Sequence, residues 1–85
     1  MTTNVYASFA SVVADIAVFC EFTNADLLSE DTGVGMMERL AFRLGDLNDA
    51  DKANLAAQLE RSSFEYSEKK TADFVRGLPE SLGLI

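Results

Sequence analysis

Carboxylates are the side chains in this sequence that could most readily do chemistry. Glu30 and Asp31 are adjacent, and Asp46, Asp49 and Asp51 follow one another closely enough to hold a cation or to act as general acid and base. The second group fails the pattern of a calcium loop of the EF-hand type, because that loop needs glycine at the position of Asp51. We therefore expect these acids to cap helices and to face solvent, and we expect no metal ion and no other cofactor.

Other catalytic groups are scarce. The chain has no histidine, which excludes Ser-His-Asp and Cys-His nucleophile systems within it. Cys20 is the only cysteine, and no lysine or arginine precedes Arg39, so no base stands near the thiol in sequence to lower its pKa. An enzyme that uses carboxylates alone would need a pair converging on a pocket, and the spacing indicates none. We expect a non-enzymatic protein in which Cys20 is a core residue.

The acids are distributed unevenly along the chain. The segment from Met1 to Glu38 contains no lysine or arginine and six acids, so it has a formal charge of −6 within a chain of net charge −7. A surface of one sign attracts cationic partners and repels phosphate. The charge therefore disfavours nucleic acid as a ligand. Gly33 and Gly35 do not change this expectation, because no phosphate-loop signature accompanies them.

These side chains must be positioned by helices. Residues 5–22 predict the first one, with Asn4 or Thr3 as its N-cap. One face of this helix is apolar, with residues at 4-3-4-3 spacing: Val5, Phe9, Val12, Ile16 and Phe19. We expect this face to be buried in the core. The other interpretation is that a partner covers this face, because the polar remainder of the helix is narrow.

A second helix is predicted over residues 33–44, with Asp31 or Thr32 as its cap. Its two glycines fit either ordinary loop geometry or the close approach of another backbone or a ligand, and we favour the loop. Gly45 should end this helix in a left-handed conformation. Leu27 and Leu28, in the polar segment before the helix, are expected to anchor that segment to the core.

A third helix is predicted over residues 49–63, with Asn48 as its N-cap. A fourth helical segment is predicted over residues 67–76, with its first residue, Ser67, as the N-cap. The segment 78–85 is apolar and should dock on the bundle, although insertion into a partner is the other interpretation. The expected fold is all-α, a small four-helix bundle-like domain with a short apolar C-terminal turn. The chain, residues 1–85, should form a single helical domain, because no linker or repeat divides it.

The apolar run 5–22 also bears on location. A membrane span is disfavoured because the run contains Asp15 and Glu21 and has no basic flank, and a signal peptide is disfavoured because no positive residue precedes the run. A single cysteine fits a reducing compartment. We expect a cytoplasmic protein that does not enter a membrane.

The acidic region from Glu21 to Glu38 is the candidate binding surface, with Leu27 and Leu28 as its apolar centre. In size, charge and helicity the chain resembles the small acidic helical immunity proteins and antitoxins of bacteria. That resemblance implies an inhibitor of a more basic protein, such as a toxin or nuclease. The alternative is a self-associating structural or adaptor module, possible as a homodimer through the first helix or the tail. The predicted partner-binding residues are Glu21, Asp26, Leu27, Leu28, Glu30, Asp31 and Glu38.

Overall fold

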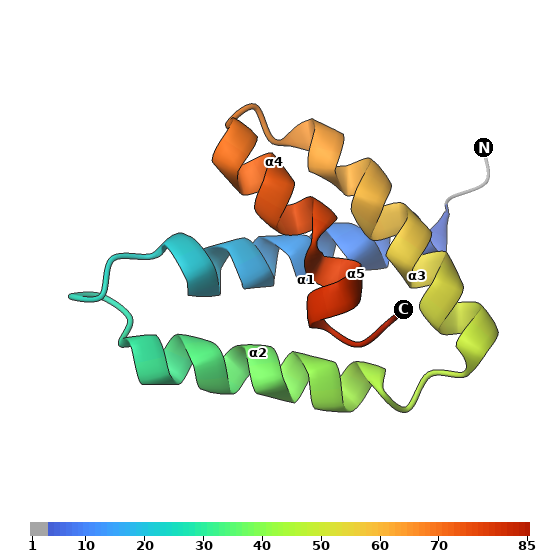
Figure 1. Ribbon diagram of the computed structural model, residues 1–85, viewed down its shortest axis with the longest axis horizontal. Helices are drawn as coiled ribbons and strands as arrows, with labels where there is room; N and C mark the ends of the chain where they lie inside the picture. The colour runs from blue at the N-terminus through green and yellow to red at the C-terminus, as the bar shows by residue number, and fades with distance from the viewer. Residues whose placement is uncertain (1–3) are drawn as a thin grey trace.

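Helices dominate the computed structural model, which describes residues 4–85 and contains no β-strand within that range. As predicted, the fold is all-α, with four main helices and a short apolar turn at the C-terminal end. α2 returns alongside α1, while α3 and α4 pack against α1 and cross in front of it (Figure 1). The elements are α1 Val5–Phe22, α2 Glu30–Leu44, α3 Asp49–Ser62, the 3-10 helix η1 Ser63–Glu65, α4 Lys69–Arg76 and α5 Leu78–Ser81.

Side-chain caps explain where the first two helices begin. Asn4 caps α1, since its Oδ1 accepts a hydrogen bond from the Ala7 amide at 3.2 Å, whereas Thr3 lies outside the described residues. α2 begins three residues earlier than predicted, because Ser29 is its N-cap and accepts from the amide of Thr32 at 3.2 Å. Glu30 and Asp31 therefore belong to the first turn, where the helix dipole favours negative charge.

The ends of the later helices differ in detail from those predicted from the sequence. Asn48 caps α3 as predicted, with its Oδ1 2.8 Å from the amide of Asp51. Ser67 does not cap α4, which starts two residues later, after Glu68. Gly45 ends α2 at the expected place but in a right-handed conformation, so its predicted left-handed geometry is wrong. Among residues 4–85 the one positive φ is that of Gly83, at 72°.

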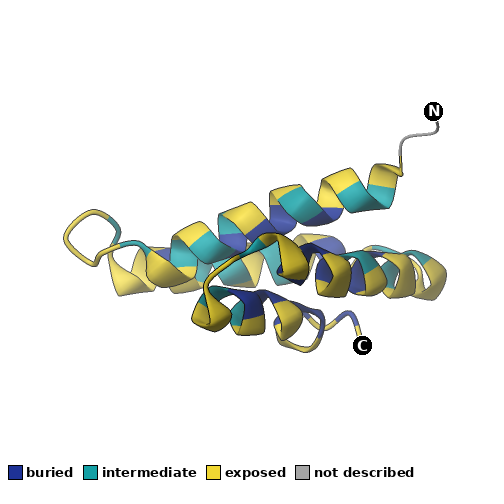
Figure 2. Cartoon of the chain, turned by 90° about the horizontal axis from the view of Figure 1, so that it is seen from above, coloured by how far each residue is buried: buried dark blue, intermediate teal, exposed yellow. Residues whose placement is uncertain are grey.

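The core uses the opposite face of α1 from the one predicted. Its buried residues are Ala10, Val13, Ala14 and Ala17, and the large apolar side chains with 4-3-4-3 spacing point outward or are only half-buried. In Figure 2 the dark blue positions of α1 face the other helices and yellow positions line its outer side. Small side chains on the inner face let α2 and α3 come close, which the bulky face would prevent.

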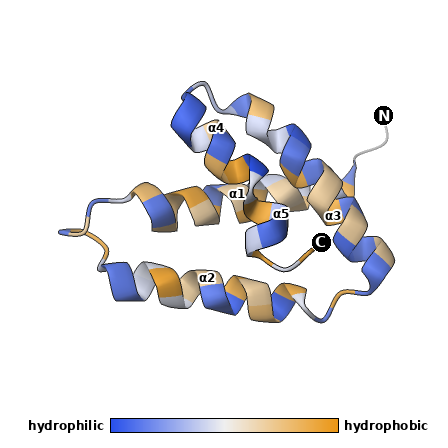
Figure 3. Cartoon of the chain, in the orientation of Figure 1, coloured by the Kyte–Doolittle hydropathy of each residue, from blue (hydrophilic) through white to orange (hydrophobic). Residues whose placement is uncertain are grey.

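The remaining core comes from α3 and the C-terminal segment. Leu55 and Leu59 of α3 are fully buried. The tail docks as expected: Leu82 and Leu84 are buried beside the main helices, where Figure 3 shows the apolar end of the chain. Ile85 is the exception, because its side chain is exposed.

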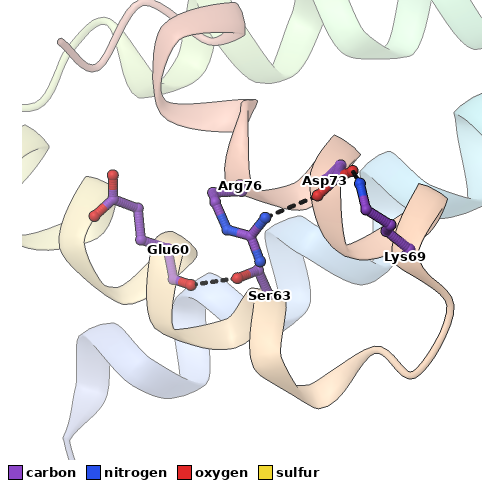
Figure 4. A network of polar contacts seen from close by, with 5 residues as sticks. All are labelled: Glu60, Ser63, Lys69, Asp73 and Arg76. Carbon is purple, nitrogen blue, oxygen red and sulfur yellow. Dashed lines mark hydrogen bonds and ion pairs between the residues drawn. The ribbon is translucent and has the colours of Figure 1, made fainter.

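Polar contacts fasten the outer elements. The hydroxyl of Tyr6 donates to Asp51, and that of Tyr66 donates to Asp15 at 2.8 Å, so two tyrosine–aspartate bonds tie α1 to the second half of the chain. On α4, Asp73 pairs with its two neighbouring bases, Lys69 and Arg76, each at 2.8 Å. Beside this network the hydroxyl of Ser63 donates to the carbonyl of Glu60 at 2.6 Å (Figure 4).

Candidate functional site

A groove between the C-terminal half of α1, the N-terminal part of α2 and the C-terminal segment is the candidate site. Its volume is about 430 Å³. Apolar side chains from α2, α4 and the tail form much of its lining, and three glutamates stand among them. We call it the acidic groove, and its lining residues are Cys20, Glu21, Glu30, Gly33, Val34, Met37, Glu38, Ala41, Phe74, Ser81 and Leu82.

The three glutamates come from two helices. Glu21 lies in the last turn of α1, and Glu30 is the first residue of α2. Glu38 follows Glu30 by eight residues, which is about 12 Å along a helix and roughly the same side of it. The short connection between α1 and α2 therefore brings Glu21 to the end of a row of carboxylates on α2.

Gly33 sets how closely these two helices approach. A Cβ at this position would lie 2.9 Å from the carbonyl oxygen of Cys20, so the backbone of α2 touches the backbone of α1 here. Both glycines lie within α2, so the favoured loop explanation is wrong for both, and close approach of another backbone is correct for Gly33. At Gly35 an added methyl group would meet no atom within 4 Å, so this glycine has no such role.

The negative charge of the acidic groove is not balanced by its own lining. No lysine or arginine of residues 4–85 lines it. The two ion pairs within residues 4–85 both involve Asp73 on α4, so neither involves a glutamate of the groove. Lys70 lies close by, but its ammonium stacks over the ring of Phe22, 5.7 Å from the ring centre. Exposed carboxylates beside an apolar floor thus remain available to an external cation.

The structure brings together only some of the predicted binding residues. Glu21, Glu30 and Glu38 line the acidic groove. The other four do not line it, and they lie in or next to the segment 23–29 that joins α1 to α2: Asp26, Leu27, Leu28 and Asp31.

Within the segment 23–29 the backbone makes one turn, with the amides of Leu27 and Leu28 bonded to the carbonyl of Asn24. Leu28 is half-buried, but Leu27 is 84% exposed. The expectation that both leucines anchor this segment is therefore wrong for Leu27. The reason is local: the turn directs the two side chains to different sides, and only one side faces the helices.

Sequence reasoning missed the apolar half of the groove. Phe74 and Leu82 lie in the last part of the chain, far from Glu30 in sequence, and no local pattern links them to it. One signal in the sequence pointed to part of this apolar lining: the apolar segment 78–85, which was predicted to dock on the bundle. The sequence did not indicate that it docks beside the glutamates of the groove.

Cys20 is half-buried at the edge of the groove, and burial raises the pKa of its thiol. A thiol with a raised pKa is a poor nucleophile at neutral pH, because the thiolate is the reactive form. Cys20 therefore contributes shape to the groove and no reactive group.

Binding is the chemistry that this arrangement supports. Within the described residues no group of three or more Cys, Asp or Glu is placed to hold a metal ion. No family model, curated protein or solved structure matches this chain. An apolar floor with carboxylates at its edge can hold an apolar side chain that is flanked by cationic ones.

Proposed function

We propose that this chain is a non-enzymatic acidic binding protein that neutralises a more basic protein partner, as an inhibitor of the immunity or antitoxin type. The partner class is a basic toxin or nuclease in the bacterial cytoplasm. One observation carries the proposal: Glu21, Glu30 and Glu38 converge on one apolar groove that no lysine or arginine of the described chain lines. The net charge of −7 favours the same kind of partner.

The two components of the groove have different roles in such a complex. Exposed carboxylates speed association with a cationic surface, while desolvated apolar contacts slow dissociation. A volume of about 430 Å³ is at the small end of ligand pockets, so it holds a few side chains. The matching element is a short partner segment with one or two apolar side chains between lysines or arginines.

The segment 23–29 extends the same surface. It projects at one end of the molecule (Figure 1) and carries Leu27 with Asp26 beside it, and Asp31 follows it in the first turn of α2. A cationic cleft built for phosphate also accepts carboxylates. A partner seated in the acidic groove would therefore meet these acids at its own substrate site, which would inhibit it by occupation.

Affinity capture with charge-matched variants tests the proposal. The groove variant carries Glu21→Gln, Glu30→Gln and Glu38→Gln. The control removes three negative charges from exposed acids outside the groove, by Asp46→Asn, Glu60→Gln and Glu68→Gln. Because both variants have the same net charge, a difference between them reports position and not total charge.

We expect wild type and the control to recover one basic protein from a lysate of the source cell at low salt, and the groove variant to lose it. The association rate of that protein with wild type should fall as ionic strength rises. Equal recovery by the groove variant, or a partner without net positive charge, would exclude the acidic groove as the inhibitory surface.

A further inference from the structure

The outer face of α1 is a second surface that the proposed function does not use. It consists of the five residues whose 4-3-4-3 spacing marks one helical face, and we call it the α1 stripe. Four of these side chains are exposed and Ile16 is half-buried. None of the five lines the acidic groove. The exposed fractions are 70% for Val5, 42% for Phe9, 54% for Val12 and 57% for Phe19.

We propose that the α1 stripe is the interface of a homodimer in which α1 of one copy packs antiparallel against α1 of a second copy. The 4-3-4-3 spacing is the seam of a two-stranded coiled coil, which fits another helix better than a flat surface. The stripe runs over two heptads and is centred on Val12. A two-fold axis at Val12 sets Val5 of one copy beside Phe19 of the other, so small and large side chains alternate along the seam.

The distribution of charge favours a second copy of the chain as the partner of the α1 stripe, and it favours antiparallel packing of the two helices. The segment 5–19 contains one charged residue, Asp15, which accepts a hydrogen bond from Tyr66, so two copies can meet without like charges along the seam. Parallel packing would place the two acidic turns after Phe22 together. Antiparallel packing separates them by about the length of α1, roughly 27 Å. An anionic bilayer is a poorer occupant, because it repels the acidic segment that ends at Glu38.

The area supports a dimer of modest affinity. If a whole Phe exposes about 200 Å² and a Val somewhat less, the stripe offers roughly 400 Å² of apolar surface per copy. That is about the size of the largest apolar patch on a typical monomer, which is often functional. Two stripes with their flanking residues reach about 1,000 Å² in total, the lower limit for a specific interface. Self-association is the second interpretation that the sequence allows, and on this geometry it coexists with an open acidic groove.

Sedimentation velocity over a range of protein concentrations tests the dimer. Val12→Glu places two carboxylates at the two-fold axis, and Phe42→Glu is its control, because Phe42 is 74% exposed and lies on α2, outside both the stripe and the acidic groove. Wild type and the control should shift from monomer to twice the monomer mass as concentration rises to about 0.5 mM, while Val12→Glu stays monomeric. A wild type that remains monomeric, or a dimer that survives Val12→Glu, would overturn the proposal.

Two further measurements keep the result decisive. Val12→Cys in a Cys20→Ala background should form a covalent dimer on mild oxidation, because the two thiols would meet at the axis; a free thiol that persists would contradict this geometry. Vesicles of phosphatidylcholine, with and without phosphatidylglycerol, test the bilayer, since α1 is long and apolar enough to cross one. Co-sedimentation with either vesicle that Val12→Glu abolishes would replace the second copy with a lipid surface. Loss of the dimer leaves partner capture through the groove untouched, so the two proposals fail separately.

Discussion

Replacing Gly33 by alanine should destabilise the protein relative to the same change at Gly35. Both glycines lie inside α2, so both substitutions gain the helix propensity of alanine over glycine, about 1 kcal/mol. They differ in what the new methyl group meets. At Gly33 it would stand 2.9 Å from the carbonyl oxygen of Cys20, whereas at Gly35 it meets no atom within 4 Å.

The magnitude follows from that contact. The carbonyl belongs to the α1 backbone and cannot rotate away like a side chain, so α2 must move outward by several tenths of an ångström. Overpacking of this kind costs about 1–3 kcal/mol. Gly35→Ala should therefore be more stable than wild type by up to about 1 kcal/mol. Gly33→Ala should be less stable than Gly35→Ala by about 1–3 kcal/mol.

Urea unfolding followed by circular dichroism measures the difference. With a slope near 1 kcal/mol per molar urea for a small domain, the two midpoints should be separated by about 1 M or more. Because the propensity gain is common to both variants, the separation isolates the contact between the two helix backbones. Equal midpoints, or a Gly33→Ala protein more stable than Gly35→Ala, would refute the close packing of α1 and α2 on which the groove depends.

Three other perturbations test the packing and the titration behaviour. Val13→Thr should lower the free energy of unfolding by about 1–3 kcal/mol because it buries a hydroxyl, whereas Val12→Thr, on the exposed stripe, should change it by less than about 0.5 kcal/mol; urea unfolding compares this pair. Leu84→Ala should cost about 2–5 kcal/mol and Ile85→Ala little, since the first side chain is buried and the second exposed; equal thermal midpoints would contradict tail docking. Burial, and then a hydrogen bond to a carboxylate, raises the pKa of Tyr66 from 10.0 to about 12, so the folded protein holds this proton more tightly than the unfolded chain. Its contribution to stability is complete below pH 10 and is lost as the pH rises to about 12; phenolate absorbance should show the late titration, and a tyrosine that titrates near pH 10 in the folded protein would contradict it.

Local signals predicted the helices well, because caps and glycines act over a few residues. Asn4 and Asn48 each cap the helix that follows them, and α1 has the predicted bounds. The predicted cap of α2, Asp31 or Thr32, is wrong, because the side chain of Ser29 caps this helix and the acids Glu30 and Asp31 stabilise its first turn.

Which face of α1 is buried could not be read from hydrophobicity. The helix is apolar on nearly all sides, so periodicity selected the bulkier stripe, whereas packing against two neighbouring helices selected the alanines around Ala14. Close approach favours small side chains, and that preference depends on helices that lie far away in sequence.

The candidate site was predictable only in its acidic half. Glu21 and Glu30 are close in sequence, so their shared surface followed from the chain itself. Phe74 and Leu82 join them through the tertiary fold alone, and Leu27 turned outward because of a single turn of backbone.

Hydrogen–deuterium exchange of the chain, alone and with its captured basic partner, would locate the binding surface. Binding in the acidic groove predicts slower exchange in the last turn of α1, in α2 from Glu30 to Ala41 and around Leu82, while amides around Val12 keep their rates. Protection confined to the outer face of α1, with unchanged exchange around Glu30 and Glu38, would show that the partner binds elsewhere and would contradict inhibition through the acidic groove.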